Sequence, residues 1–95
     1  MPTTAKIAVH IPPPLREHIA GAREVQVSGA SVREVLAELG RAHPKLHRNI
    51  CDESGAVRRH IGVFVNKKLI RERDGIDTAL ADGDVVFILP AVSGG

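Results

Sequence analysis

The sequence ends in two glycines, Gly94 and Gly95, which follow the short segment Pro90, Ala91, Val92 and Ser93. Because glycine has no Cβ, an extended Gly-Gly segment can enter a slot that is too narrow for any side chain. The reactive group that such an end presents is its terminal carboxylate. We therefore expect the chemistry to take place on Gly95, with residues 90–95 forming a flexible, extended tail about 20 Å long. The alternative is an ordinary frayed terminus.

The other residues that could do chemistry form no recognisable site. His43 and His47 have the i,i+4 spacing of a metal-binding pair, but Pro44 lies between them and is expected to break a helix there. Cys51 has no C-x-x-C partner, so an ordinary loop thiol is favoured over a nucleophile or a persulfide carrier. The nucleotide-binding patterns G-x-x-x-x-G-K-[ST] and G-x-G-x-x-G are both missing. The sequence thus predicts no metal site and no bound cofactor.

The composition is typical of one small globular domain. Of the 95 residues, 43% are hydrophobic and 25% are charged, and Phe64 and Phe87 are the only Phe, Tyr or Trp residues. This shortage of aromatic side chains disfavours a nucleic-acid surface that stacks on bases. No apolar run approaches the roughly 20 residues that cross a bilayer, and no secretory signal is visible. The single Cys51 excludes an internal disulfide. We expect a cytoplasmic protein with no nucleic-acid or membrane partner.

The charges are unevenly distributed along the chain. Basic residues dominate segment 41–73, whereas residues 74–95 contain four aspartates and no basic residue. The basic side chains around the predicted third strand and its turn are Arg58, Arg59, Lys67, Lys68, Arg71 and Arg73. Two interpretations of segment 58–73 stay open: a solvated loop region with scattered cations, or a docking patch for an acidic protein partner.

The clearest element is a helix that begins after Ser31. Ser31 and Glu34 form the S-x-x-E pattern of a capping box, which satisfies two backbone donors at a helix start. The apolar residues then recur at i, i+3, i+4 and i+7 and mark one face, as Val32, Val35, Leu36 and Leu39. Either Gly40 or Pro44 is expected to end the helix.

Five strands are predicted around this helix, over residues 5–11, 24–28, 60–65, 68–70 and 85–89. Prolines 12–14 end the first strand, and residues 15–22 are a connection that can include a short helical turn. Segment 46–57 is predicted as a polar loop. Asn66-Lys67 and Asp82-Gly83-Asp84 are predicted turns, and residues 74–81 allow one helical turn. The last strand is continuously apolar, so we expect it to be covered on both faces.

Together these elements predict an α+β fold of the β-grasp (ubiquitin-like) type. A mixed sheet of about five strands packs on one main helix, and the first and last long strands lie side by side. Residues 1–89 form the domain and residues 90–95 the tail. Because Pro90 fixes φ and lacks an N–H, strand pairing is expected to stop there.

The last fifteen residues resemble the MoaD/ThiS family of sulfur carriers. The turn Asp82-Gly83-Asp84, an apolar strand, Pro90 and the terminal Gly94-Gly95 follow one another as in that family. The helix after Ser31 and the stretch from Val63 to Asn66 also match the family's order of elements. The resemblance covers essentially the whole chain, with its most specific part at the C-terminal end.

The resemblance implies a co-substrate rather than an enzyme. An E1-like partner would use ATP to adenylate the Gly95 carboxylate, and sulfur would then displace AMP to leave a thiocarboxylate. Pro90, Ala91, Val92, Ser93 and Gly94 would be the arm that enters the partner's active site. ATP would bind the partner only.

The ending is most similar to carriers that supply sulfur for cysteine biosynthesis. There the acceptor would be a pyridoxal-phosphate enzyme, and a metalloprotease would release the product. One alternative is the small subunit of molybdopterin synthase, acting with its large subunit. Another is a ubiquitin-like protein modifier, although such tails usually carry arginine before the glycines. Thiamin carriers and donors to specialised metabolites stay open, as do the immediate sulfur donor and the oligomeric state.

Overall fold

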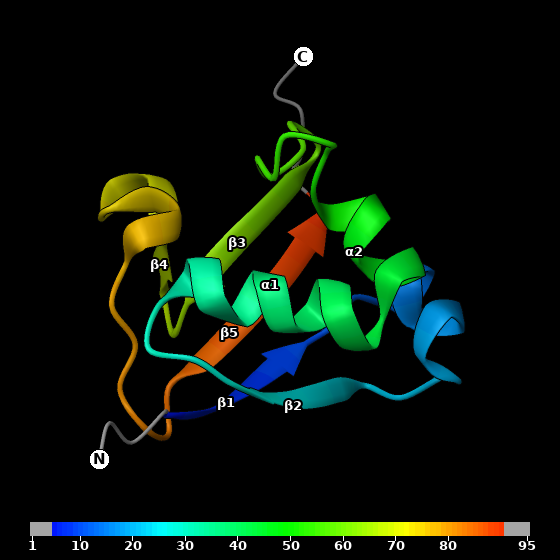
Figure 1. Cartoon of the computed structure of the whole chain (residues 1–95), viewed down its shortest axis with the longest axis horizontal. Helices are drawn as coiled ribbons and strands as arrows, with labels where there is room; N and C mark the ends of the chain where they lie inside the picture. Colours follow the sequence, from blue (N-terminus) through cyan, green and yellow to red (C-terminus); the bar gives the residue numbers. More distant parts are fainter. Residues whose placement is uncertain (1–4, 91–95) are drawn as a thin grey trace.

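The computed structural model describes residues 5–90, which form a β-grasp fold (Figure 1). Five strands form one mixed sheet in the order β2-β1-β5-β3-β4. Their bounds are Lys6–His10 (β1), Glu24–Ser28 (β2), Ile61–Val65 (β3), Lys68–Leu69 (β4) and Val85–Pro90 (β5). Two α-helices, Val32–Ala42 (α1) and Pro44–Ile50 (α2), cover one face of the sheet. The predicted fold class is confirmed.

The two longest-range pairings place the last strand at the centre of the sheet. β5 lies between β1 and β3, parallel to β1 and antiparallel to β3. The predicted central pair of first and last strands is therefore confirmed. The Asn66-Lys67 turn is confirmed as well, because Val65 lies opposite Lys68 and Asn66 adopts a left-handed φ of 56°.

Helix α1 begins as the capping box predicts. The Glu34 N–H donates to Ser31 Oγ at 3.3 Å, and Glu34 Oε1 accepts from the Ala30 N–H at 3.0 Å. The helix continues through Gly40 and ends at Ala42, before Pro44. Gly40 has a packing role there, because a Cβ on it would come within 3.2 Å of the His47 ring. Glycine thus allows α2 to approach α1 closely.

The prediction of a polar loop over residues 46–57 is wrong in its first part. Helix α2 begins at Pro44, where the missing N–H of proline costs nothing because the first helical N–H groups have no partner within the helix. Leu46 and Ile50 are four residues apart on this helix and both are completely buried. The fold therefore has two helices against the sheet, where one main helix was predicted.

Three short 3₁₀ helices complete the structure: η1 (Pro13–Ile19), η2 (Ile70–Glu72) and η3 (Gly75–Asp77). The first and third confirm the helical turns predicted in residues 15–22 and 74–81. Among residues 5–90, none of the helices has the length and apolar character needed to cross a bilayer.

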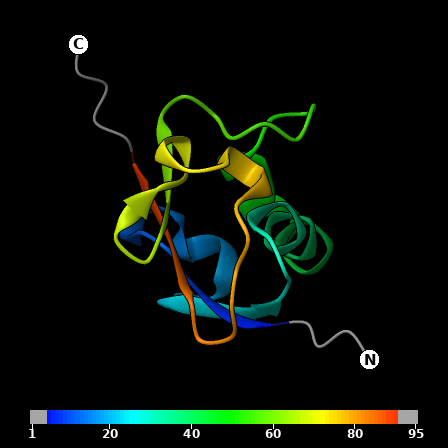
Figure 2. The same ribbon diagram turned by 90° about the vertical axis from the view of Figure 1, so that its left-hand side faces the viewer.

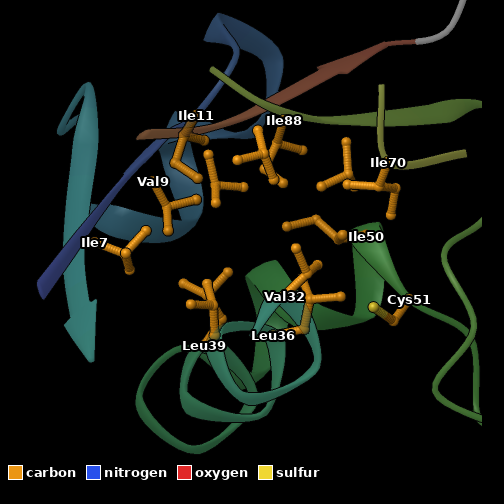
Figure 3. Close-up of a cluster of buried hydrophobic side chains, with 14 of the residues drawn as sticks. Ile7, Val9, Ile11, Val32, Leu36, Leu39, Ile50, Cys51, Ile70 and Ile88 are labelled. Carbon is orange, nitrogen blue, oxygen red and sulfur yellow. The ribbon is translucent and has the colours of Figure 1, made fainter. Parts of the chain in front are cut away.

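The core lies between the helices and the inner face of the sheet (Figure 3). Alternate residues of the three central strands point into it, and α1 and α2 close it from the other side. Val9, Val32, Leu39, Leu46, Ile50, Val86 and Ile88 are completely buried. Burial of such side chains stabilises the fold by about 1.5–3 kcal/mol each.

Candidate functional site

The strand that leads to the predicted tail occupies the centre of the sheet. Pro90 is the last residue of β5, is exposed, and lies opposite Ile61 of β3. Pro90 is the last paired residue of β5, where pairing was expected to stop, but it belongs to the strand and not to the tail in which the sequence analysis placed it. Ala91, Val92, Ser93, Gly94 and Gly95 lie outside the described residues, so their roles stay predictions.

The turn before β5 is held by side-chain hydrogen bonds. Asp82 Oδ1 accepts from the Lys6 N–H at 2.7 Å, and Asp84 Oδ2 accepts from the Ala81 N–H at 2.9 Å. Gly83 adopts a φ of 92°, which confirms the predicted tight turn and explains the glycine. These bonds anchor the turn to the start of β1.

Asn66 fixes the start of β5 from the other side. Its N–H donates to the Val85 carbonyl at 2.8 Å, and its Oδ1 accepts from the Val85 N–H at 3.1 Å. Its Nδ2 also donates to Asp84 Oδ1 at 3.2 Å. Asn66 thus joins the β3–β4 turn to the turn that precedes β5. This connection sets the register of β5 and so the position of Pro90.

The outer face of the sheet carries an apolar surface beside β5. Phe64 lies opposite Phe87, and Gly62 lies opposite Leu89. Phe64, Phe87 and Val85 are half-buried, and Leu89 is 43% exposed. We call Phe64, Val85, Phe87 and Leu89 the outer apolar face. The prediction that β5 is covered on both faces is therefore wrong: the helices cover only its inner face.

The outer apolar face is bordered by polar residues of β1 and β2. His10 Nε2 lies 3.5 Å from Glu24 Oε1, and the His10 ring packs against Phe87 with 4.8 Å between ring centroids. An apolar centre with a polar border is the usual composition of a protein-binding surface. The sequence analysis missed this face, because the pairing of Phe64 with Phe87 joins strands that are distant in the sequence.

Cys51 is a buried thiol at the end of α2. It is only 2% exposed, and burial together with the nearby Asp52 raises its pKa from the ordinary 9.0 to about 11. The reactive form of cysteine is the thiolate, so this environment makes Cys51 a poor nucleophile. The structure thus favours the inert thiol over the nucleophile or persulfide alternative.

The histidines and acidic residues do not gather into a metal site. Among residues 5–90, no group of three or more His, Cys, Asp or Glu side chains is arranged to hold a metal ion. Pro44 separates His43 from His47 as predicted, although it does so by starting a second helix.

The basic segment divides between two places. Arg58, Arg59 and Arg71 line a groove beside β3. Lys67 and Lys68 lie exposed at the β3–β4 turn, and Arg73 is exposed after η2. The groove was invisible in the sequence, since it is built from a loop, a strand edge and two 3₁₀ turns that are separate in the chain.

Comparison with known proteins places the chain among small sulfur carriers. The sequence pattern of the ThiS family matches residues 9–95. The chain is 37% identical over 91 residues to the sulfur carrier protein CysO of Mycobacterium tuberculosis, covering 94% of this chain and 98% of that protein.

Solved structures agree with this relationship. A chain from the crystal structure of the Amycolatopsis orientalis BexX/CysO complex matches with a TM-score of 0.83 and 35% identity, covering 94% of this chain and 99% of that one. The small archaeal modifier protein 1 of Methanosarcina acetivorans matches with a TM-score of 0.82 and 35% identity, covering 99% and 100% of the two chains. With the family pattern matching nearly the whole sequence, the chain belongs to the ThiS family of ubiquitin-like sulfur carrier proteins.

Proposed function

We propose that this protein carries sulfur as a thiocarboxylate on Gly95 and donates it to cysteine biosynthesis. The observation that carries the proposal is the end of β5: the central strand finishes exposed at Pro90, and the five residues beyond it end in Gly94-Gly95. The likeness to CysO over 94% of the chain supports this choice of pathway. The protein acts as a co-substrate, and its partners supply the catalysis.

The proposed reaction has two steps at the Gly95 carboxyl group. The Gly95 carboxylate attacks the α-phosphorus of ATP on an E1-like partner, which forms the acyl adenylate and releases pyrophosphate. Sulfide then attacks the Gly95 carbonyl carbon in the partner's active site and displaces AMP, which leaves the thiocarboxylate. Because glycine has no side chain, this carbonyl is open to attack from either face. ATP binds only the partner, and reduced Cys51 fits the cytoplasm as the compartment.

Pro90 and residues 91–95 have different roles in the proposed function. Pro90, held in β5, gives the tail a fixed origin, while residues 91–95 span about 17 Å when extended. That length reaches a buried active site while the outer apolar face rests on the partner's surface. An acceptor of the pyridoxal-phosphate type would then receive the sulfur, and a metalloprotease would release the product.

Intact mass spectrometry tests the proposal. The protein is incubated with an adenylating enzyme, ATP and sulfide, and exchange of one oxygen for one sulfur at Gly95 is expected. A variant with one residue added after Gly95 is the matched control and should stay unloaded. An unchanged mass of the wild type with active enzyme, or loading of the extended variant without proteolysis, would contradict the mechanism.

A second candidate is a protein modifier that forms isopeptide bonds with lysines. The likeness to small archaeal modifier protein 1 supports it. A ladder of higher-mass conjugates in cells, present with the tagged full chain and lost on deletion of Gly95, would favour this function. The molybdopterin synthase small subunit is a third, tested by exchanging the acceptor enzyme in the sulfur-transfer assay.

A further inference from the structure

One edge of β3 has no strand beside it along half its length. β5 pairs with β3 from Ile61 to Val65, whereas β4 pairs only with Phe64 and Val65. Within residues 5–90, no strand pairs with Ile61–Val63 on the β4 side. The Ile61 N–H already donates to the Arg58 carbonyl at 3.0 Å, so the other backbone groups of this edge are the ones offered to an added strand.

A groove of about 400 Å³ lies along this uncovered edge. The 56–59 loop borders it on one side, and η2 and η3 border it on the other. Both sets of segments lie in the upper part of Figures 1 and 2, around the end of the molecule where β3 begins. The groove therefore lies beside the part of β3 that no strand covers.

The walls of the groove combine aliphatic and cationic side chains. Val57, Ile70 and Ile76 provide apolar surface, and Arg58, Arg59 and Arg71 provide the charge. We call this site the arginine groove. No aspartate or glutamate of the described chain lines it, and none of its three arginines makes an ion pair there within 4.0 Å. Arg58 donates from Nε to the Arg48 carbonyl at 2.7 Å and also borders a second hollow with Asp52, whose pKa it helps to lower. Arg59 and Arg71 therefore supply most of the charge that the groove offers a ligand.

We propose that the arginine groove binds an extended acidic segment of the partner protein that takes up the tail. The segment adds as a strand to Ile61–Val63, its carboxylates face the arginines, and an aliphatic side chain rests on Val57 and Ile76. Guanidinium groups suit this task because they bind carboxylates in a bidentate manner. This proposal rests on the proposed function, since it assigns the segment to the same partner.

The position of the groove links it to the tail. Ile61, at one end of the uncovered edge, lies opposite Pro90, from which the tail begins. One partner can therefore contact the groove and the tail together, and the two contacts reinforce each other by high effective concentration. A single-stranded nucleic acid fits less well, because neither Phe64 nor Phe87 lines the groove for base stacking.

The test is an NMR titration of the ¹⁵N-labelled full chain with a defined probe. The probe is the acetylated and amidated peptide Asp-Glu-Ile-Asp-Val-Glu-Glu, and the control peptide has Asn and Gln in place of the acids. Saturable amide shifts are expected in residues 57–63 and 69–71, with binding of the control at least about tenfold weaker. Arg71→Glu should weaken binding about fivefold. Arg23→Glu, which makes the same change in net charge outside the groove, should leave the dissociation constant unchanged.

Several results would overturn the proposal. These are no saturable shift at millimolar peptide, shifts centred on the outer apolar face, equal weakening by Arg23→Glu, or tighter binding of a ten-residue oligothymidylate. Groove shifts on deletion of residues 91–95 in the absence of peptide would make the tail the occupant, and concentration-dependent shifts would make it a second copy. The titration involves no sulfur chemistry, so the two proposals can fail separately. If the peptide does not bind but Gly95 is loaded with sulfur, only the groove proposal is refuted. If the peptide binds but Gly95 is not loaded, only the carrier function is refuted.

Discussion

The two faces of β5 differ in what surrounds them. Val86 and Ile88 point toward the helices and are completely buried, whereas Phe87 and Leu89 point to the outer face and stay partly exposed. The same strand therefore stabilises the fold with one face and presents apolar surface with the other. Under the proposed function this separation is useful, because surface changes that alter partner choice leave the core intact.

The largest effect is expected on the inner face. Ile88→Ala removes a completely buried side chain at the centre of the sheet and should lower the free energy of unfolding by about 2–5 kcal/mol. Urea denaturation followed by circular dichroism measures this loss. The matched change on the outer face, Leu89→Ala, should cost less than about 1 kcal/mol. Equal losses at both positions would break the distinction between the two faces.

A function-specific effect is expected on the outer face. Leu89→Asp places a charge in the outer apolar face and should raise the KM for sulfur loading about tenfold, equivalent to about 1.4 kcal/mol, with kcat maintained. Ala37→Asp puts the same charge on the exposed side of α1, across the sheet from this face, and is the control. Steady-state kinetics with the adenylating enzyme separate the two variants. An unchanged KM for Leu89→Asp would remove this face from the docking surface.

A change in the tail should spare both faces of β5. Gly94→Ala adds a methyl group where the partner's slot is expected to be narrow, and should slow adenylation about fivefold, or about 1 kcal/mol. The urea midpoint should equal that of the wild type. Pyrophosphate release gives the rate, and adenylation of Gly94→Ala at the wild-type rate would refute the steric argument for glycine.

The smallest effect concerns Cys51, which packs with the core on the helix side. Its pKa is raised to about 11 in the folded protein, so the folded state holds the thiol proton more tightly than the unfolded state. The resulting stabilisation is complete below about pH 9 and is lost as the pH rises toward about 11. We expect the stability difference between wild type and Cys51→Ala to fall by about 1 kcal/mol between about pH 9 and about pH 10, the lower half of this window. Denaturant unfolding at several pH values measures it, and a flat difference would show that the thiol is not buried in solution.

Short sequence patterns correctly predicted the elements that depend only on neighbouring residues. The Ser31–Glu34 capping box placed the start of α1, and the left-handed turns at Asn66 and Gly83 followed from residue types that tolerate them. The prediction of a loop after Pro44 was wrong because proline has two effects on helices. It ends a helix that precedes it, and it is also favoured at the first position of a new helix. The burial of Leu46 and Ile50 favours the new helix over a loop, and this burial depends on residues far away in the sequence.

By itself the sequence determined the β-grasp fold, its central strand pair and the family signal at Gly94-Gly95, because strand alternation, turn residues and a capping box act over a few neighbouring residues. Tertiary structure alone decided that β5 is covered on one face only. It also decided that Pro90 belongs to β5 and that Arg58, Arg59 and Arg71 share one groove. The physical reason is that exposure and the clustering of charges depend on which distant segments pack together, and the periodicity of a single segment does not contain that information.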